Sequence, residues 1–241
     1  DYRGGGRSSA RATAAWVAAG AMAKILLARH DIRVWGFVSQ IGPFRLNDDT
    51  TVTIEEAMTA SPLACPDKSV TEEMLKFLGE TQAAGDTAGG VVTCIISGVP
   101  AGLGEPLFDK LHADLAKAVL CIPSVKGFEV GSGFAAASMT GSRHNDPFIA
   151  HDGRISTATN HSGGIQGGIS NGMDILFRAA FKPVSTLAMS QQTVDRNGRP
   201  VTFEGKGRHD VCVVPRAVPI VEAMAALTIA DHLLRSRCGK E

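Results

Sequence analysis

The residues best suited to chemistry fall into four short segments, and the first of them opens the chain. Residues 1–11 read Asp-Tyr-Arg-Gly-Gly-Gly-Arg-Ser-Ser-Ala-Arg. Three glycines let backbone N–H groups approach a ligand, and a helix expected over 8–29 adds unpaired N–H donors at its start. Arg3, Arg7 and Arg11 can bind oxyanions in a bidentate manner. This pattern predicts a phosphate or carboxylate site, although a glycine turn with a serine cap and solvated arginines would have the same sequence pattern.

The other three segments are more ambiguous when each is taken alone. Residues 161–172 contain two Gly-Gly pairs, which predict either backbone pressed against a flat ligand or a bulged sheet edge. The segment 182–186 offers a lysine and two hydroxyls, which could hold an anion or simply begin a surface strand. The segment 205–212 joins an arginine, a histidine and an aspartate, which suits acid–base chemistry but also suits an ordinary polar turn.

Several other kinds of site are not supported. His144, His151 and His161 lie in a long polar stretch, 139–172, without the spacing of a zinc site, so no metal is predicted. The five cysteines include no CxxC pair and are interpreted as small core residues rather than as disulfides or metal ligands. A serine hydrolase is also not indicated, because the one GxSxG match, at 168–172, lies in the glycine-rich segment and no helix is predicted directly after it, as a nucleophile elbow would require.

The overall composition is that of a soluble globular protein. The 241 residues are 44% hydrophobic and 20% charged, with a formal net charge of +0. A balanced charge gives no general attraction for nucleic acid or for an anionic membrane. No apolar run approaches the roughly 18 uncharged residues of a membrane-spanning helix, so neither nucleic acid nor membrane is expected as a partner.

The elements that must position these segments alternate without a strict strand–helix–strand repeat. Helices are predicted over 8–29, 69–85, 107–121 and 215–237, and extended segments over 32–41, 91–99, 125–130, 173–181 and 185–190. A capping box at 69–72 opens the second helix, and Asn197-Gly198 predicts a hairpin turn. The strands after residue 122 have no helices between them, which predicts an α+β fold with mainly antiparallel sheet, in a single domain over 1–241.

Six segments, in one order, resemble the chorismate synthase family. They are DYRGGGRSSAR (1–11), GVPAGLGEPLFDKL (98–111), IPSVKGFEVGSGF (122–134), TNHSGGIQGGISNG (159–172), KPVST (182–186) and GRHDVCVVPRAVPIVEAMAALTIADHLL (207–234). The resemblance covers essentially the whole chain. It implies a β-α-β sandwich, with helices packed between antiparallel sheets, and a cytoplasmic homotetramer.

The resemblance also implies a reaction. The family converts 5-enolpyruvylshikimate 3-phosphate to chorismate and phosphate by a 1,4-anti elimination, and it requires reduced FMN although the reaction is redox-neutral overall. The flavin is thought to donate electron density transiently while phosphate leaves, and its N5 atom then takes part in removing the ring proton, assisted by an aspartate that matches Asp210. The source of the reduced flavin stays open between an intrinsic NADP-linked reductase and an external reductant, since no segment reads as an NAD(P)H site.

Individual roles follow from the same resemblance. The residues that match FMN contacts are Arg7, Ser8, Ser9, Pro123, Ser124, Gly167, Lys182, Pro183, Val184, Ser185, Thr186 and Arg208. Arg3 and Arg11 are assigned to the substrate's phosphate or carboxylates, because the substrate is a trianion whose leaving group gains charge. Two positions depart from the family pattern: Val211 replaces a usual proline, and Ala12 replaces a frequent glutamate.

The largest departure is at the start of the chain. Family members carry roughly a further third of chain before the segment that matches residue 1, with GESHG and RPGHAD motifs and both active-site histidines. Residues 1–241 alone are therefore expected not to catalyse the reaction and to leave sheet edges exposed. Two alternatives stay open: a non-catalytic chain that folds and assembles, and an anion-binding metabolic enzyme without flavin.

Overall fold

The computed structural model describes residues 9–47, 50–59, 62–151, 153–205 and 210–238. The chain divides into two compact units. Unit 1 comprises 1–36, 93–179 and 218–241, and unit 2 comprises 37–92 and 180–217. Three strands and one long helix have residues in both units, so the single domain expected over 1–241 stays a prediction.

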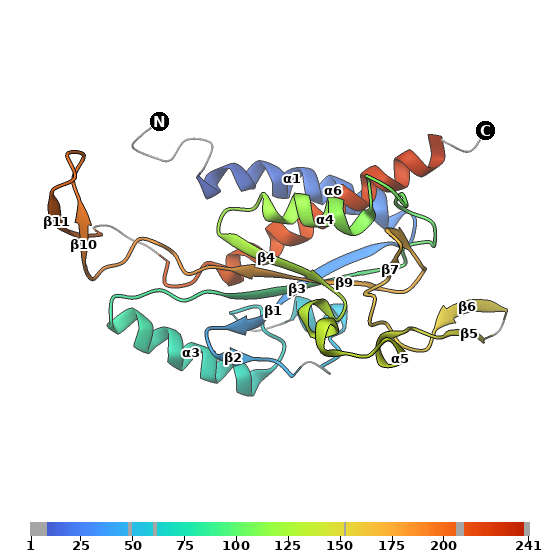
Figure 1. Cartoon of the computed structure of the whole chain (residues 1–241), viewed down its shortest axis with the longest axis horizontal. Coiled ribbons are helices and arrows are strands. Elements are labelled where there is room, and N and C mark those ends of the chain that lie inside the picture. The colour runs from blue at the N-terminus through green and yellow to red at the C-terminus, as the bar shows by residue number, and fades with distance from the viewer. Residues whose placement is uncertain (1–8, 48–49, 60–61, 152, 206–209, 239–241) are drawn as a thin grey trace. The chain divides into compact units, whose positions relative to one another are not determined.

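Helices and short hairpins make up most of unit 1. Its helices are α1 (Thr13–Ala28), α4 (Leu111–Leu120), the short α5 (Gly141–His144) and most of α6 (Val214–Cys238), with 3-10 turns at Ala10–Ala12 and Gly133–Ser138. Its own strands are β4 (Val125–Val130), β5 (Phe148–His151), β6 (Arg154–Thr157), β7 (Ile165–Gln166) and β8 (Ile169–Ser170). In Figure 1, α1, α4 and α6 form one layer beside the strands β4 and β9 of this unit.

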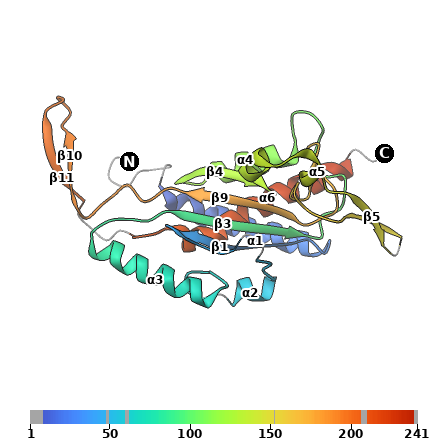
Figure 2. The ribbon, with the colours of Figure 1, turned by 60° about the horizontal axis from the view of Figure 1, so that its bottom comes forward.

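Unit 2 holds β2 (Phe44–Arg45), α2 (Ile54–Met58), α3 (Lys68–Ala83), β10 (Ser190–Val194) and β11 (Pro200–Glu204). The strands with residues in both units are β1 (Arg33–Ile41), β3 (Gly90–Ser97) and β9 (Ile175–Phe181). One five-stranded sheet has the order β2-β1-β3-β9-β4, and β5–β6, β7–β8 and β10–β11 form separate antiparallel hairpins. Figure 2 shows β4 and β9 side by side. The α+β class predicted from the sequence is confirmed.

The apolar pattern of the sequence explains how the sheet and helices pack in unit 1. Residues of β9 are buried at every second position, as one face of a strand requires, and Phe177 of this strand lies 5.2 Å, between ring centroids, from Phe128 of β4. The buried residues of α4 are Leu111, Leu115 and Val119, which recur every four residues as predicted. The helix predicted over 107–121 nevertheless begins only at Leu111, and Leu107, which the same spacing would have buried, is exposed. The glycine-rich loop packs against these two elements: its Gly168 carbonyl accepts from the backbone N of Leu111, and its Gly163 carbonyl accepts from that of Leu176.

Helices α1 and α6 approach each other very closely. Gly20 of α1 leaves no room for a side chain, because a methyl group there would overlap Ala223 of α6. Lys24 donates to Oε2 of Glu222 over 2.5 Å, and the other carboxylate oxygen of Glu222 accepts from the backbone N of Gly36 at 2.7 Å. A partly buried ion pair with an additional backbone donor therefore joins α1, α6 and the start of β1.

Two helical segments have the length and hydropathy of a membrane-spanning helix, namely Ala10–Ala28 and α6. The window in α6 is 56% buried and that in Ala10–Ala28 is 22% buried. The burial of α6 is that of a core helix of a globular protein, whereas the window in Ala10–Ala28 is mostly exposed in this chain. Lys24, in the first segment, forms an ion pair with Glu222 of α6 in the same unit, which balances its positive charge.

Two details of unit 2 can be compared with the sequence prediction. Helix α3 begins at Lys68 and is capped by Asp67, whose Oδ1 accepts from the backbone N of Val70 at 3.0 Å. The predicted capping box at 69–72 was therefore placed two residues late, because an aspartate is an equally strong N-cap. The Asn197-Gly198 turn is confirmed, with Asp195 accepting from two backbone N–H groups across it.

Candidate functional site

Part of the predicted opening site lies outside the described residues, namely Arg3, Arg7 and Ser8; so does Arg208. Ser9 is described and caps the 3-10 turn that leads into α1. Its Oγ atom accepts from the backbone N of Arg11 at 3.4 Å and from Nε of the same arginine at 3.2 Å. The predicted serine cap is thus confirmed, and it ties the Arg11 side chain to the start of the helix.

The segment Lys182–Thr186 follows β9 in unit 2 and folds back on itself. Lys182 Nζ donates to Oγ of Ser185 at 3.2 Å and to the carbonyl of Pro183 at 3.1 Å. From outside the segment, Thr87 donates its hydroxyl to the carbonyl of Val184 at 2.7 Å. The fold therefore gathers an ammonium group and a hydroxyl at the surface, a pair of donors that suits a phosphate.

Asp210 approaches the same place from a different part of the chain. The backbone N of Ala88 donates to the carbonyl of Val211 at 2.8 Å. Gly89, the next residue, has no room for a side chain, because a methyl group would overlap the carbonyl of Phe181. Residues 87–89 thus contact the segments on both sides, and unit 2 brings together two predicted site segments that are far apart in sequence. Sequence reasoning had assigned no role to residues 87–89.

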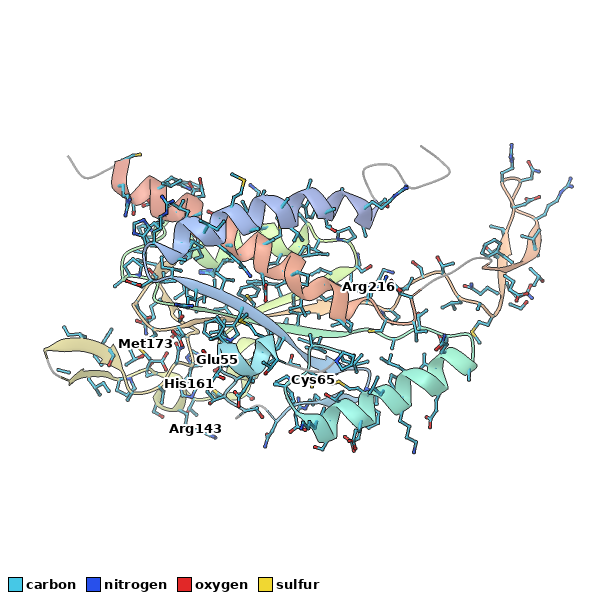
Figure 3. All side chains as sticks on the ribbon, turned by 180° about the vertical axis from the view of Figure 1, so that it is seen from behind. Glu55, Cys65, Arg143, His161, Met173 and Arg216 are labelled. Atoms are coloured by element: carbon cyan, nitrogen blue, oxygen red, sulfur yellow. The ribbon has the colours of Figure 1, made fainter. Side chains whose placement is uncertain are left out.

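The predicted catalytic aspartate is paired with an arginine. Nη1 of Arg216 donates to Oδ2 of Asp210 at 2.8 Å (Figure 3 labels Arg216). The side chains are 37% exposed for Asp210 and 73% exposed for Arg216, so the pair contributes at most about 1 kcal/mol to stability. Burial, and to a lesser degree the charge of Asp210, raises the pKa of the Cys212 thiol. That thiol therefore stays protonated beside the carboxylate, and Arg216 is a partner that the sequence analysis missed.

Pro123 and Ser124 form the turn between α4 and β4 in unit 1. Ser124 has φ of 73°, a left-handed conformation that is uncommon for a residue other than glycine. Strain of this kind is of the order of 1–3 kcal/mol and gathers at binding and catalytic sites. The predicted cofactor contact at Ser124 thus coincides with a strained backbone position.

The glycine-rich segment forms a hairpin around Gly167. Gln166 pairs with Ile169, which leaves Gly167 and Gly168 as a two-residue turn with φ of 62° and 96°. A turn of this type requires positive φ at both positions, so backbone geometry alone explains one Gly-Gly pair. Gly167 itself is exposed and has open space where a side chain would lie.

The predicted contacts in unit 1 lie at opposite ends of one strand. Ser124 immediately precedes β4, whereas Gly131, just after β4, packs against Gly163 of the loop that leads to Gly167. A strand of six residues is roughly 20 Å long. The structure therefore does not bring the Pro123–Ser124 turn and Gly167 side by side.

A carboxylate that sequence reasoning did not identify holds the glycine-rich loop. Asp146 is buried and accepts hydrogen bonds from the hydroxyl of Thr159 (2.6 Å), the backbone N of His161 (2.8 Å), and both the backbone N (2.8 Å) and the hydroxyl (2.6 Å) of Ser162. Burial acts to raise the pKa of Asp146, but these hydrogen bonds outweigh it and hold the pKa well below its usual value. The loop is thus built around an ionised buried group.

The described part of the chain contains no cluster of side chains that could bind a metal ion. Among those residues, no three His, Cys, Asp or Glu side chains are arranged to hold an ion. The described cysteines are free thiols, with Cys65 and Cys94 buried. The interpretation of the cysteines as core residues is confirmed for these two but is wrong for Cys121 and Cys238, which are exposed.

Comparison with known proteins identifies the family. The chorismate synthase family model matches residues 1–234. A protein named chorismate synthase from Cytophaga hutchinsonii is 57% identical over 239 residues, which is 98% of this chain and 66% of that protein. The chorismate synthase of Opitutus terrae is 52% identical over 242 residues, 99% of this chain and 67% of that protein.

A solved structure agrees with this result. A chain described as the crystal structure of chorismate synthase superposes with a TM-score of 0.78 at 30% identity, covering 95% of this chain and 64% of that chain. The chain thus spans about two thirds of the length of the proteins it matches. It belongs to the chorismate synthase family, and the resemblance described from six segments of its sequence is confirmed.

Proposed function

We propose that this chain provides part of the active site of a carbon–oxygen lyase that converts 5-enolpyruvylshikimate 3-phosphate to chorismate and inorganic phosphate. The reaction breaks one C–O bond and one C–H bond and forms a C=C bond, with no net oxidation. Relatives named chorismate synthase, matched over nearly the whole chain, support this activity.

The observation that carries the proposal is the meeting of two segments on residues 87–89. The carbonyl of Val184 and that of Val211, the residue after Asp210, accept hydrogen bonds from Thr87 and Ala88 of this short stretch, although nothing in local sequence links the two segments. One segment offers donors for a phosphate and the other a carboxylate. A group that holds the phosphate of the cofactor and a proton-transfer group, both placed by the same short stretch, suit a cofactor-assisted elimination.

The residues present fit reduced FMN as the cofactor. Lys182 and Ser185 supply an ammonium and a hydroxyl 3.2 Å apart, which is suitable chemistry for the FMN phosphate. Ser124 and Gly167 of unit 1 are two further contacts that the family resemblance implies, and this fit to the FMN phosphate does not depend on them. Bound reduced FMN would supply the transient electron density that helps phosphate leave.

Asp210 is proposed to assist removal of the ring proton. Its carboxylate is partly exposed and its negative charge is balanced by Arg216, so it can hydrogen-bond to a neighbouring proton-transfer group without moving far. Arg11, beside Ser9 at the start of α1, is proposed as a contact of an anionic group of the substrate, together with Arg3. A cytoplasmic homotetramer without nucleic acid or membrane partners completes the proposal, as the family resemblance implies.

The test is an assay of the full-length gene product with substrate and chemically reduced FMN, following chorismate absorbance and phosphate release. Equal amounts of both products are expected, and Lys182→Met should weaken FMN binding by about tenfold or more. A wild-type protein that changes neither the spectrum nor the fluorescence of FMN would favour the anion-binding enzyme without flavin. Normal flavin binding with no product would favour a chain that binds and assembles without catalysis.

A further inference from the structure

A pocket of about 390 Å³ lies in unit 1, at the end of β4 that is away from Ser124. Its lining residues are His112, Val130, Gly133, Ala136, His144, His161, Ser162, Ile165, Gln166 and Gly167. The volume is in the range of small-molecule sites. Of these residues only Gly167 has a role implied by the family resemblance, so the remaining lining has no explanation so far.

Three histidines from three separate elements meet at this pocket. His112 lies on α4, His144 ends α5, and His161 belongs to the loop held by Asp146. The rings of His144 and His161 are 5.8 Å apart between centroids. Figure 3 shows His161 with Arg143 of α5 in the same region. Imidazoles from distant parts of the chain that line one pocket are hard to explain by packing alone.

His161 is fixed in place by Asp146. Its backbone N donates to Oδ1 of Asp146, and its Nδ1 lies 3.2 Å from the same oxygen. That ring nitrogen is buried and lacks an aligned hydrogen-bond partner. A buried polar atom left without a partner is unfavourable, so a proton on the ring, or a ligand that reorients it, would improve this arrangement.

The charged groups around the pocket favour an anion. Lys110, just before α4, is close enough to His112 to influence its titration, and Arg143 directly precedes His144. The two carboxylates are already satisfied: Glu129 of β4 is paired with Arg178 of β9 at 2.6 Å, and Asp146 is saturated by the glycine-rich loop. Lys110 and Arg143 therefore supply two positive charges near the pocket, against the one ionised carboxylate of Asp146, before any histidine is protonated.

We propose that this pocket binds an oxyanion, a phosphate or a carboxylate, of a small organic molecule, with the three histidines as hydrogen-bond donors. Gln166 would add a neutral polar contact, while Val130 and Ile165 would cover the apolar body of the ligand. The proposal does not rest on the reaction proposed above. The pocket lies wholly within unit 1, so no part of unit 2 is needed to form it.

The binding should depend on pH in a defined direction. Burial, and then the charge of Lys110, lowers the pKa of His112 below its ordinary value of 6.5. A bound oxyanion favours the protonated ring and raises that pKa, so binding takes up a proton. Affinity is therefore greatest at pH values where the ring is already protonated, and it decreases as the pH rises through the pKa of the complex.

The test follows the histidine ring signals of the full-length gene product by NMR, with isotope-labelled histidine assigned through single variants. The probes are inorganic phosphate, shikimate and shikimate 3-phosphate, which separate phosphate from carboxylate as the recognised group, and FMN. Signals of His112, His144 and His161 should move saturably with at least one probe, and Kd should rise at least fivefold between about pH 6 and pH 8.

Variants make the assignment independent of any other anion site in the protein. The double variant His144→Gln with His161→Gln should weaken Kd, read from the His112 signal, by about tenfold or more. The matched control is His30→Gln, because His30 contacts Arg237 away from the pocket and its loss should leave Kd unchanged. Pocket signals that stay fixed with all four probes, or a double variant with wild-type Kd, would overturn the proposal.

Discussion

Asp146 accepts two hydrogen bonds from Ser162, one from its backbone N at 2.8 Å and one from its hydroxyl at 2.6 Å. Sixteen residues separate the two in sequence, so this carboxylate closes the long polar stretch into a defined loop. The hydrogen bonds require the ionised form of Asp146, since a protonated carboxyl would lose acceptor capacity. The loop that carries His161 and leads to Gly167 therefore depends on one buried charge.

Asp146→Asn should destabilise the protein by about 2–4 kcal/mol, because an amide cannot replace both acceptor oxygens in a buried site. Urea unfolding of the full-length gene product measures the loss. Asp174→Asn is the matched control in the same unit: burial raises the pKa of Asp174, so its charge is unfavourable and its removal should be neutral or slightly stabilising. Equal losses for the two variants would contradict the role of Asp146.

The same carboxylate predicts a pH dependence. The pKa of Asp146 is lower in the folded state than in the unfolded chain, so its contribution to stability is present above the unfolded value, near pH 4, and is lost as the pH falls through and below it. Wild-type unfolding free energy should therefore decrease more steeply below about pH 4 than that of Asp146→Asn. Parallel curves for the two proteins in that range would be evidence against an ionised Asp146.

Glu222 joins two helices and a strand, and its two oxygens can be tested separately. Glu222→Ala removes both the ion pair with Lys24 and the acceptor for the Gly36 N–H, and should cost about 2–3 kcal/mol. Glu222→Gln keeps an acceptor for Gly36 and should cost less. Lys24→Met, which leaves Glu222 without its cation, serves as the comparison. Thermal and urea unfolding of the three variants would contradict this account if Glu222→Gln were the most damaging.

Gly167 and Gly168 share one hairpin turn but differ in the space around them. Alanine at either position must adopt positive φ, which costs roughly 1 kcal/mol. At Gly168 the new methyl group would also lie 2.6 Å from the carbonyl of Glu105, whereas at Gly167 it would meet nothing. Gly168→Ala should therefore be clearly less stable than Gly167→Ala.

This pair of variants also tests the predicted flavin contact. If Gly167 contacts FMN, Gly167→Ala should weaken FMN binding while unfolding stability changes by only about 1 kcal/mol. Fluorescence titration of FMN with each purified variant measures the effect. Wild-type FMN affinity in Gly167→Ala would remove this residue from the list of predicted contacts.

Patterns that repeat along one element predicted the fold well. The four-residue spacing of Leu111 and Leu115 gave α4, and the alternation in β9 gave a strand with one buried face. The β5–β6 hairpin was missed because its apolar residues are exposed rather than alternating with a core: Phe148 is 67% and Ile155 is 75% exposed. A periodic pattern of apolar residues arises where one face of an element is buried. A hairpin with little buried surface, such as β5–β6, therefore shows no such pattern in its sequence.

Relationships between distant segments could not be predicted from the residues alone. Asp146 is an ordinary aspartate before a proline until the fold places Thr159 and Ser162 around it. Likewise, nothing in the Thr87–Gly89 stretch indicates that two predicted site segments contact it. Family resemblance identified Lys182 and Asp210 because it compares whole chains, whereas local chemistry left both ambiguous.

The pairing of Asp210 with Arg216 leads to a prediction that separates catalysis from folding. Asp210→Asn should reduce turnover of the full-length gene product by about 100-fold or more if the carboxylate assists proton removal. Its unfolding free energy should change by less than about 1 kcal/mol, because the pair is largely exposed. Arg216→Gln leaves the carboxylate in place and should reduce turnover far less. Turnover with reduced FMN, FMN affinity and urea unfolding are measured for each variant. A large loss of FMN affinity or of stability in Asp210→Asn would assign the residue a structural role, whereas a selective loss of turnover supports its part in the chemistry.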